Sequence, residues 1–102
     1  MPIIPVELLS FNAKRLDNQT VRLNWTTATE LNSAYFSIEK STDGTKFNVI
    51  GQVQAAGQSS QKLDYSFDDT NTSSDNILYY RLKQMDIDGQ DRKSTRLNSS
   101  HG

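Results

Sequence analysis

The chain has 102 residues, the length of one ordinary domain with enough chain to build a single core. Eleven basic and twelve acidic residues leave a net charge of −1, which offers no electrostatic attraction to nucleic acid or to an anionic membrane. The lack of cysteine excludes disulfides and thiolate chemistry, and no apolar run approaches the roughly 20 residues needed to cross a bilayer. Neither nucleic acid nor membrane insertion is therefore expected.

The first residues are expected to form a linker that leads onto an edge strand. Two prolines in residues 1–5 keep the backbone extended and remove backbone donors. A strand begins near Val6, where the apolar residues Leu9 and Phe11 alternate with polar ones. This pattern predicts a strand with one buried face.

The strongest strand pattern lies in Thr20–Thr27, where Val21, Leu23 and Trp25 alternate with polar residues. Trp25 is the only tryptophan and would bury more apolar area than any other side chain. Neighbouring strands are therefore expected to cover it. The covering residues are predicted to be Leu9, Phe11, Tyr65 and Phe67 within its sheet, and Phe36, Ile38, Tyr80 and Leu82 from the opposite sheet.

Residues 28–34 are expected to form a loop before the next strand, at 35–41. In that strand the alternation predicts two buried side chains, those of Phe36 and Ile38. The exposed side chains are predicted to be Tyr35, Ser37 and Glu39.

The next hairpin has two local signals. Asp43-Gly44 favours a tight turn with positive φ at the glycine. In residues 46–55 the alternation slips between Val49 and Ile50, and Gly51 marks where a β-bulge can absorb the slip.

Two more amphipathic strands follow, at 63–68 and at 77–86. The longer of them should lie centrally. Asp88-Gly89 favours a hairpin turn, so a final strand should return beside residues 79–85. In the strand at 77–86, the inward residues are predicted to be Leu78, Tyr80 and Leu82. Six strands separated by turn signals, without a helical period, predict an all-β antiparallel sandwich.

Four blocks, in order, resemble the fibronectin type III-like modules of Bacteroidota secreted proteins. The blocks are PVELLSFNAK, VRLNWTTATELNSAYFSIEKSTDG, FNVIGQV and LYYRLKQMDIDG. The resemblance implies a fibronectin type III/immunoglobulin-like sandwich over residues 6–90, with Trp25 at the buried position of the second strand. Because Leu78 stands where the family usually has a tyrosine, a standard tyrosine corner is not expected. Such modules often precede the sorting domain of the type IX secretion system, which implies a secreted or cell-surface protein.

The last residues, 91–102, resemble the in-frame translation of a sequencing adapter, DRKSTRLNSSH. This resemblance implies a non-native tail and a fold that lacks its native last strand after Gln90. The single histidine, His101, would then carry no functional meaning. The alternative is a genuine polar strand or tail.

An enzyme is not expected, because His101 is the only histidine and no cysteine is present to form a nucleophile–histidine pair. Glu30 and Glu39 are both expected at exposed positions with ordinary acidity. The stretch Asp86–Asp91 lacks calcium-loop spacing. The acidic residues at 64, 68, 69 and 75 are interpreted as a solvated cluster, with weak calcium binding as the alternative. No metal or cofactor is predicted.

Tyr35, Tyr79 and Arg81 are the candidate binding residues, on the solvent face of one sheet. They would form a shallow surface for a carbohydrate or a protein. The alternative is cross-strand stabilisation, with tyrosine packed on tyrosine and Glu39 paired with Arg81 for about 0.2–1 kcal/mol. The sequence thus favours a non-catalytic, monomeric spacer or docking module whose partners are flanking domains of the same polypeptide, with an adhesion module as the alternative.

Overall fold

Two antiparallel β-sheets face each other in the structure, a computed structural model that describes residues 7–31, 33–72, 77–87 and 91–100. The strands are β1 (Glu7–Arg15), β2 (Val21–Leu31), β3 (Ser33–Ser41), β4 (Asn48–Gln54), β5 (Gln58–Ser59), β6 (Leu63–Asp69), β7 (Ile77–Asp86) and β8 (Asp91–Ser100). The predicted all-β antiparallel sandwich is confirmed.

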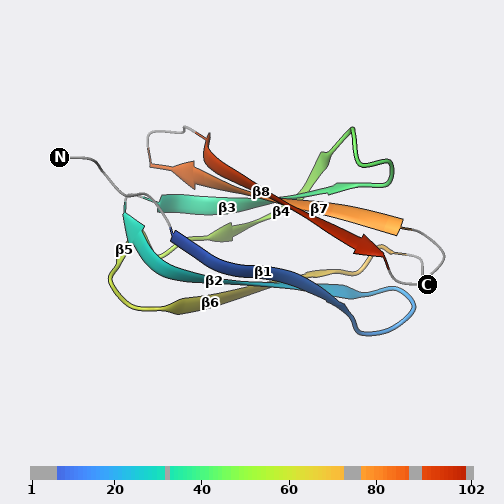
Figure 1. The fold of residues 1–102 in the computed structure, drawn as a ribbon, viewed down its shortest axis with the longest axis horizontal. Coiled ribbons are helices and arrows are strands. Elements are labelled where there is room, and N and C mark those ends of the chain that lie inside the picture. Colours follow the sequence, from blue (N-terminus) through green and yellow to red (C-terminus); the bar gives the residue numbers. More distant parts are fainter. Residues whose placement is uncertain (1–6, 32, 73–76, 88–90, 101–102) are drawn as a thin grey trace.

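Each sheet has a distinct strand order (Figure 1). In the first sheet β2 lies between β1 and β6, and its last residues pair with the short β5. The second sheet has the order β4-β3-β7-β8. In the second sheet, β3 and β7 therefore have a paired strand on each side. The edges are β4 and β8 in that sheet and β1, β6 and the short β5 in the first sheet.

The core is built around Trp25, as the sequence predicts. Phe11 and Tyr65 are its direct register partners on either side, and the Tyr65 ring stacks on it at a centroid distance of 5.7 Å. Phe36 reaches it from the opposite sheet at 5.6 Å. The fully buried apolar residues are Val21, Leu23, Trp25, Phe36, Ile38, Leu78, Tyr80 and Leu82. Phe11, Tyr65 and Phe67 are partly buried and pack against this cluster.

The prediction that Leu9 belongs to the core is wrong. The pairing of β1 with β2 shifts between Leu8 and Ser10, so Leu9 is the extra residue of a β-bulge. Its side chain is 52% exposed, and Leu8 packs against the core instead. A bulge changes the face of every residue before it, so strict alternation fails at this point.

Two further sequence predictions around β3 are also wrong. The expected loop at 28–34 is largely strand, because β2 continues to Leu31 and β3 starts at Ser33. Ser37 and Glu39 were expected to be exposed, yet they are 5% and 6% exposed. They lie on the outer face of a central strand, and the side chains of Arg81 and Lys83 from β7 contact Glu39.

The predictions for the β3–β4 hairpin are confirmed. Gly44 has a φ of 78°. Asp43 Oδ1 accepts hydrogen bonds from the backbone N–H groups of Thr45 and Lys46, which lower the pKa of Asp43 to about 2. The register of β4 shifts at Ile50, immediately before Gly51. A side chain at Gly51 would overlap the ring of Phe67 from the opposite sheet, so glycine is required for this close approach.

A final strand, β8, lies beside β7 as expected and consists of the adapter-like residues. The predicted turn at Asp88-Gly89 lies outside the described residues. The buried residues Leu78, Tyr80, Leu82 and Gln84 of β7 have as register partners Ser99, Leu97, Thr95 and Lys93. Only one of these four register positions holds an apolar residue, so β8 pairs with the β7 backbone without the pattern of a core-forming strand.

Candidate functional site

The three predicted binding residues share the outer face of the second sheet but do not gather at one point. Tyr35 pairs with Met85, and Tyr79 pairs with Ser41 at the other end of β3. Six residues of strand separate the two tyrosines, about 20 Å. The structure therefore contradicts packing of tyrosine on tyrosine, and Arg81 lies between them.

Arg81 is held in a cluster with Glu39, Lys83 and Phe47. The expected pair of Glu39 and Arg81 is confirmed, since Arg81 Nε donates to Glu39 Oε1 at 2.7 Å and Nη2 contacts the same oxygen. Lys83 Nζ lies 3.6 Å from Glu39 Oε2. The guanidinium of Arg81 also stacks 4.2 Å from the centre of the Phe47 ring. Two cations thus contact one buried carboxylate, and one of them also stacks on an aromatic ring.

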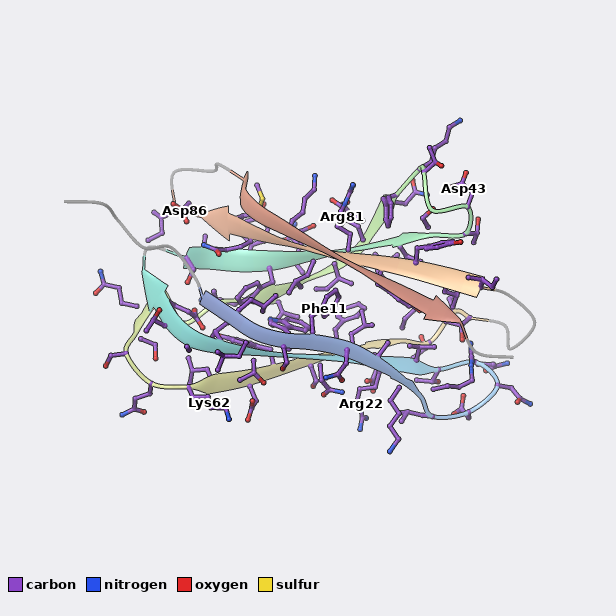
Figure 2. The ribbon with its side chains drawn as sticks, in the orientation of Figure 1. Phe11, Arg22, Asp43, Lys62, Arg81 and Asp86 are labelled. Atoms are coloured by element: carbon purple, nitrogen blue, oxygen red, sulfur yellow. The ribbon has the colours of Figure 1, made fainter. Side chains whose placement is uncertain are left out.

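The outer face of the first sheet is different. Arg22 Nε and Nη2 bind Asp68 at 2.8 and 3.0 Å, and Thr26 donates to Asp64 at 2.7 Å. The outward register positions hold Ser10, Asn12, Lys14, Arg22, Asn24, Thr26, Asp64, Ser66 and Asp68. None of these is aromatic, and their charges balance. Figure 2 shows Arg22 and Arg81 on opposite outer sides of the sandwich, with Phe11 between the sheets. A binding role therefore suits the second face better than the first.

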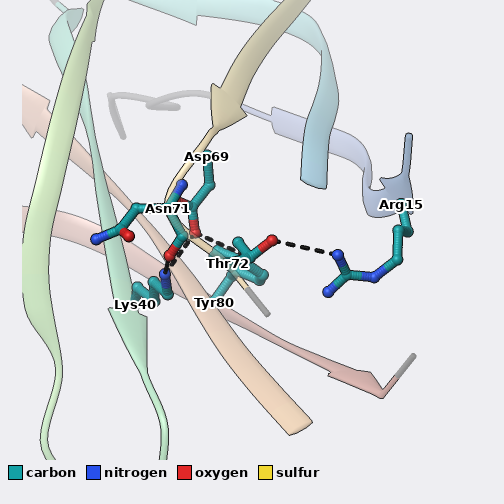
Figure 3. A network of polar contacts seen from close by, with 6 residues as sticks. All are labelled: Arg15, Lys40, Asp69, Asn71, Thr72 and Tyr80. Carbon is teal, nitrogen blue, oxygen red and sulfur yellow. Dashed lines mark hydrogen bonds and ion pairs between the residues drawn. The ribbon is translucent and has the colours of Figure 1, made fainter. Parts of the chain in front are cut away.

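A polar network surrounds the buried pair of Tyr80 and Asp69, near the ends of β1 and β6 (Figure 3). Tyr80, which is fully buried, donates a hydrogen bond of 2.8 Å to Asp69 Oδ2. Lys40 Nζ lies 2.9 Å from the same oxygen and donates to the carbonyl of Asn71 at 2.6 Å. Arg15, the last residue of β1, donates a hydrogen bond of 3.2 Å from Nη1 to the hydroxyl of Thr72. The network anchors the segment after β6 to both sheets.

This network is not among the features predicted above from the sequence, although the sequence holds a signal for it. Lys40 follows Phe36 and Ile38 on the inward side of its strand, and Asp69 follows Phe67 in the same way. Two opposite charges at the inward ends of two strands predict a buried pair, because an unpaired buried charge is costly. The acidic cluster interpretation obscured it.

Glu30 is a second buried carboxylate, 3% exposed, and the prediction of an exposed position is wrong. Its oxygens accept hydrogen bonds from the hydroxyls of Thr27, Ser33 and Tyr65 and from the backbone N–H of Ala56. These donors come from β2, β3, β6 and the segment after β4. The carboxylate therefore fixes the corner where β2 passes into β3, and its burial is compensated by hydrogen bonds to its charged form.

Both tyrosines that donate to these carboxylates are held in the neutral form. Burial, followed by the hydrogen bond to Glu30, raises the pKa of Tyr65. Burial and the hydrogen bond to Asp69 likewise raise the pKa of Tyr80. Their phenols act as fixed donors, and the carboxylates are occupied by internal partners. This arrangement stabilises the fold and offers no free acid–base pair at either position.

The acidic residues considered for calcium binding do not converge. Asp64 and Asp68 face outward and bind Thr26 and Arg22, whereas Asp69 faces inward to Lys40 and Tyr80. Asp75 lies outside the described residues. Within residues 7–31, 33–72, 77–87 and 91–100, no group of three or more potential metal ligands occurs. No helix in this part of the chain is long and apolar enough to cross a membrane.

Comparison with known proteins identifies the fold but no family. No protein-family model matches the chain, and no curated protein matches it in sequence. A solved structure described as "Myokine structure" is similar, with a TM-score of 0.63 and 13% sequence identity. The match covers 96% of this chain and 100% of that chain. At this identity the likeness concerns the β-sandwich alone.

Proposed function

We propose that the chain is a non-catalytic fibronectin type III-like module that acts as a spacer or docking unit in a larger secreted or cell-surface bacterial protein. Its partners are flanking domains of the same polypeptide. The sequence resemblance of four blocks supports the family, and the division of strands between two sheets agrees with it. Secretion through the type IX system belongs to the same proposal and is supported by the resemblance.

The direction of the edge strands carries the spacer proposal. β1 begins at one end of the sandwich and β8 finishes at the other (Figure 1). Any last strand that pairs antiparallel with β7 runs in this direction, so the position of its end does not depend on the origin of residues 91–100. A ten-residue strand is about 33 Å long. Segments attached before β1 and after β8 would therefore leave from opposite ends and be held apart by the length of the module.

Internal rigidity supports the same role. The two buried carboxylates, Glu30 and Asp69, bind donors from both sheets or from several strands. Such closed networks fix strand positions without presenting reactive groups to solvent. A spacer needs this kind of fixed geometry.

The test is a distance measurement on the chain placed between two fluorescent proteins. A flexible Gly/Ser linker of equal residue number is the control. Energy transfer alone does not give the distance between the two fluorescent proteins in both cases, so small-angle X-ray scattering measures that distance directly. We expect the two fluorescent proteins to be separated by at least the length of the sandwich. The distribution of their distances should not become broader when salt is added. Flanking proteins packed side by side, on the same end of the module, would contradict the spacer role.

A second candidate function is adhesion through the outer face of the second sheet. The stacking of Arg81 on Phe47 and the half-buried Tyr35 and Tyr79 favour it over the first sheet's outer face, which has no aromatic residue at the outward register positions described above. Binding to a glycan or protein array should be lost in Tyr79→Ala and kept in Ser66→Ala, on the other face. If no array component binds, the adhesion role has no support.

A further inference from the structure

The four edge strands of seven or more residues, β1, β4, β6 and β8, are protected to different degrees. Charged residues on an edge strand oppose the addition of another strand. β1 contains Glu7, Lys14 and Arg15, β6 contains three aspartates, and β8 contains four charged residues. β4, with the sequence NVIGQVQ, contains none. Among the described edge strands of seven or more residues, β4 is therefore the one without a charge, and the two-residue β5, Gln58–Ser59, is uncharged as well.

The regular part of this edge follows the bulge at Ile50. Ala55 N donates to Ala34 O, so these two residues form a hydrogen-bonded pair of the antiparallel ladder. Hydrogen-bonded pairs alternate along the ladder, which directs the backbone groups of Val53 and Gly51 toward β3. The N–H and C=O groups of Gln52 and Gln54 are then directed away from β3, toward the open side of the edge.

A hollow of about 300 Å³ lies on the inner side of the same edge. Ile50 and Phe67 provide its apolar wall, and Lys40, Asp68, Asp69, Thr70 and Asn71 complete its lining. On the outer side of the edge, Val49 is 57% exposed. A strand added to β4 would place alternate side chains over the hollow and beside Val49.

The charges at the hollow are already neutralised within the molecule. Asp68 is bound by Arg22, and Asp69 is bound by Lys40. A charged group entering the hollow would therefore have to displace an existing pair. An apolar or small polar side chain would not.

The size of the edge selects the kind of partner. Seven residues of strand are about 24 Å long. Edge-to-edge pairing alone buries only a few hundred Å², roughly, far less than the 1,200 Å² or more of a stable interface between folded proteins. A single extended segment fits this surface better than a second folded copy, because it gains main-chain hydrogen bonds and can insert a side chain.

We propose that β4 is a peptide-docking edge, which binds an extended, uncharged segment of a partner polypeptide as an added strand. The segment alternates apolar and small polar residues, and one apolar side chain occupies the hollow lined by Ile50 and Phe67. The site goes beyond the spacer role and does not depend on it, since a failed distance measurement leaves the β4 edge unchanged.

The test uses the whole chain and a display library of random nine-residue peptides. Enriched peptides are measured against three proteins: the unaltered chain, Gln52→Pro and Gln52→Ala. Proline removes the N–H directed away from β3, whereas alanine removes the side chain and keeps that N–H. We expect Gln52→Ala to bind normally and Gln52→Pro to bind at least tenfold more weakly.

Hydrogen exchange on the unaltered chain provides a second readout that needs no variant. Bound peptide should slow exchange at the amides of Gln52 and Gln54 and leave the β6 edge unchanged. Failure to enrich any peptide, equal binding to a folded Gln52→Pro, or protection elsewhere would overturn the proposal. Dimers of the chain that disappear in Gln52→Pro would overturn it as well, in favour of a second copy as the occupant.

Discussion

The phenol of Tyr80, on β7, donates a hydrogen bond of 2.8 Å to the carboxylate of Asp69, at the end of β6. The bond joins the two sheets, and Lys40 completes the charge balance at the same oxygen. Because Tyr80 is 0% exposed and Asp69 is 5% exposed, no bulk water can replace the lost donor. The pair is therefore the most direct test of what this network contributes to stability.

We expect Tyr80→Phe to lower the free energy of unfolding by about 1.5–3 kcal/mol, the range for a hydrogen bond to a charged group. Urea denaturation followed by Trp25 fluorescence measures the change. Tyr35→Phe is the control, since it removes the same hydroxyl from a half-buried tyrosine of the outer face. Equal losses in the two variants would show that the hydrogen bond to Asp69 contributes no more to stability than an ordinary tyrosine hydroxyl.

The same bond predicts a loss of stability at high pH. Burial and the hydrogen bond to Asp69 raise the pKa of Tyr80 above its ordinary value of 10.0. Burial and the hydrogen bond to Glu30 raise the pKa of Tyr65 in the same way. Below pH 10 these phenols are neutral in both the folded and unfolded states, so they add no pH dependence. Above it only the unfolded chain loses these protons, so stability falls as pH rises. Between pH 9 and about 12, the free energy of unfolding should fall less steeply with pH in Tyr80→Phe than in the unaltered chain. A parallel decline would contradict this assignment.

Glu30 gives a prediction about the corner between β2 and β3. Glu30→Gln keeps the shape but turns one acceptor oxygen into an NH₂ donor, facing hydroxyl and amide donors. We expect a loss of about 1–3 kcal/mol, the cost of poorly satisfied buried polar groups. Hydrogen exchange at Ala56 should also become faster, because its N–H donates to this carboxylate. Unchanged stability together with unchanged exchange at Ala56 would contradict the role of the carboxylate.

The inward pattern of the strands was predictable because alternation reports which face is buried. It placed Trp25 beside Phe11 and Tyr65 and opposite Phe36, as observed. Leu9 was assigned wrongly because a bulge adds one residue and reverses the alternation before it. The sequence carries no glycine or other marker at that bulge, unlike the one beside Gly51.

The burial of Glu30 and Glu39 could not be predicted from alternation, because it depends on which strands become neighbours. Glu39 is covered by Arg81 and Lys83 from β7, some 42 and 44 positions later in the chain. Glu30 is satisfied by Tyr65 and Ala56, which also come from other elements. Likewise, the uncharged edge at β4 has meaning only once the strand order shows that β4 is an edge.

Gly51 predicts a steric effect across the sandwich. An added methyl group would overlap the ring of Phe67, so we expect Gly51→Ala to destabilise the fold by about 1–3 kcal/mol, the usual cost of overpacking. Thermal unfolding measures the loss. Phe67→Leu provides the control, because the smaller side chain makes room for the methyl group. The double variant should lose less than the sum of the two single losses, and simple additivity would contradict the contact.

The pairing of β8 with β7 allows the last strand to be improved by design. Thr95 and Ser99 are the register partners of the buried residues Leu82 and Leu78. In a core-forming last strand, positions opposite buried residues hold apolar side chains. Apolar residues at 95 and 99 should therefore extend the core. We expect the double variant Thr95→Val and Ser99→Val to gain about 1–2 kcal/mol in stability from added apolar burial.

The matched control is the double variant Ser94→Val and Asn98→Val, at the alternate register positions opposite Lys83 and Tyr79. Both double variants raise β-propensity, so only the first should gain stability from burial. Melting temperatures compare them directly. An equal rise in both would mean that propensity alone acts, and no rise in either would mean that the register positions of β8 do not extend the core. A rise confined to the first would show that β7 still requires an apolar partner strand, which residues 91–100 supply only at Leu97 among the four positions opposite its buried residues.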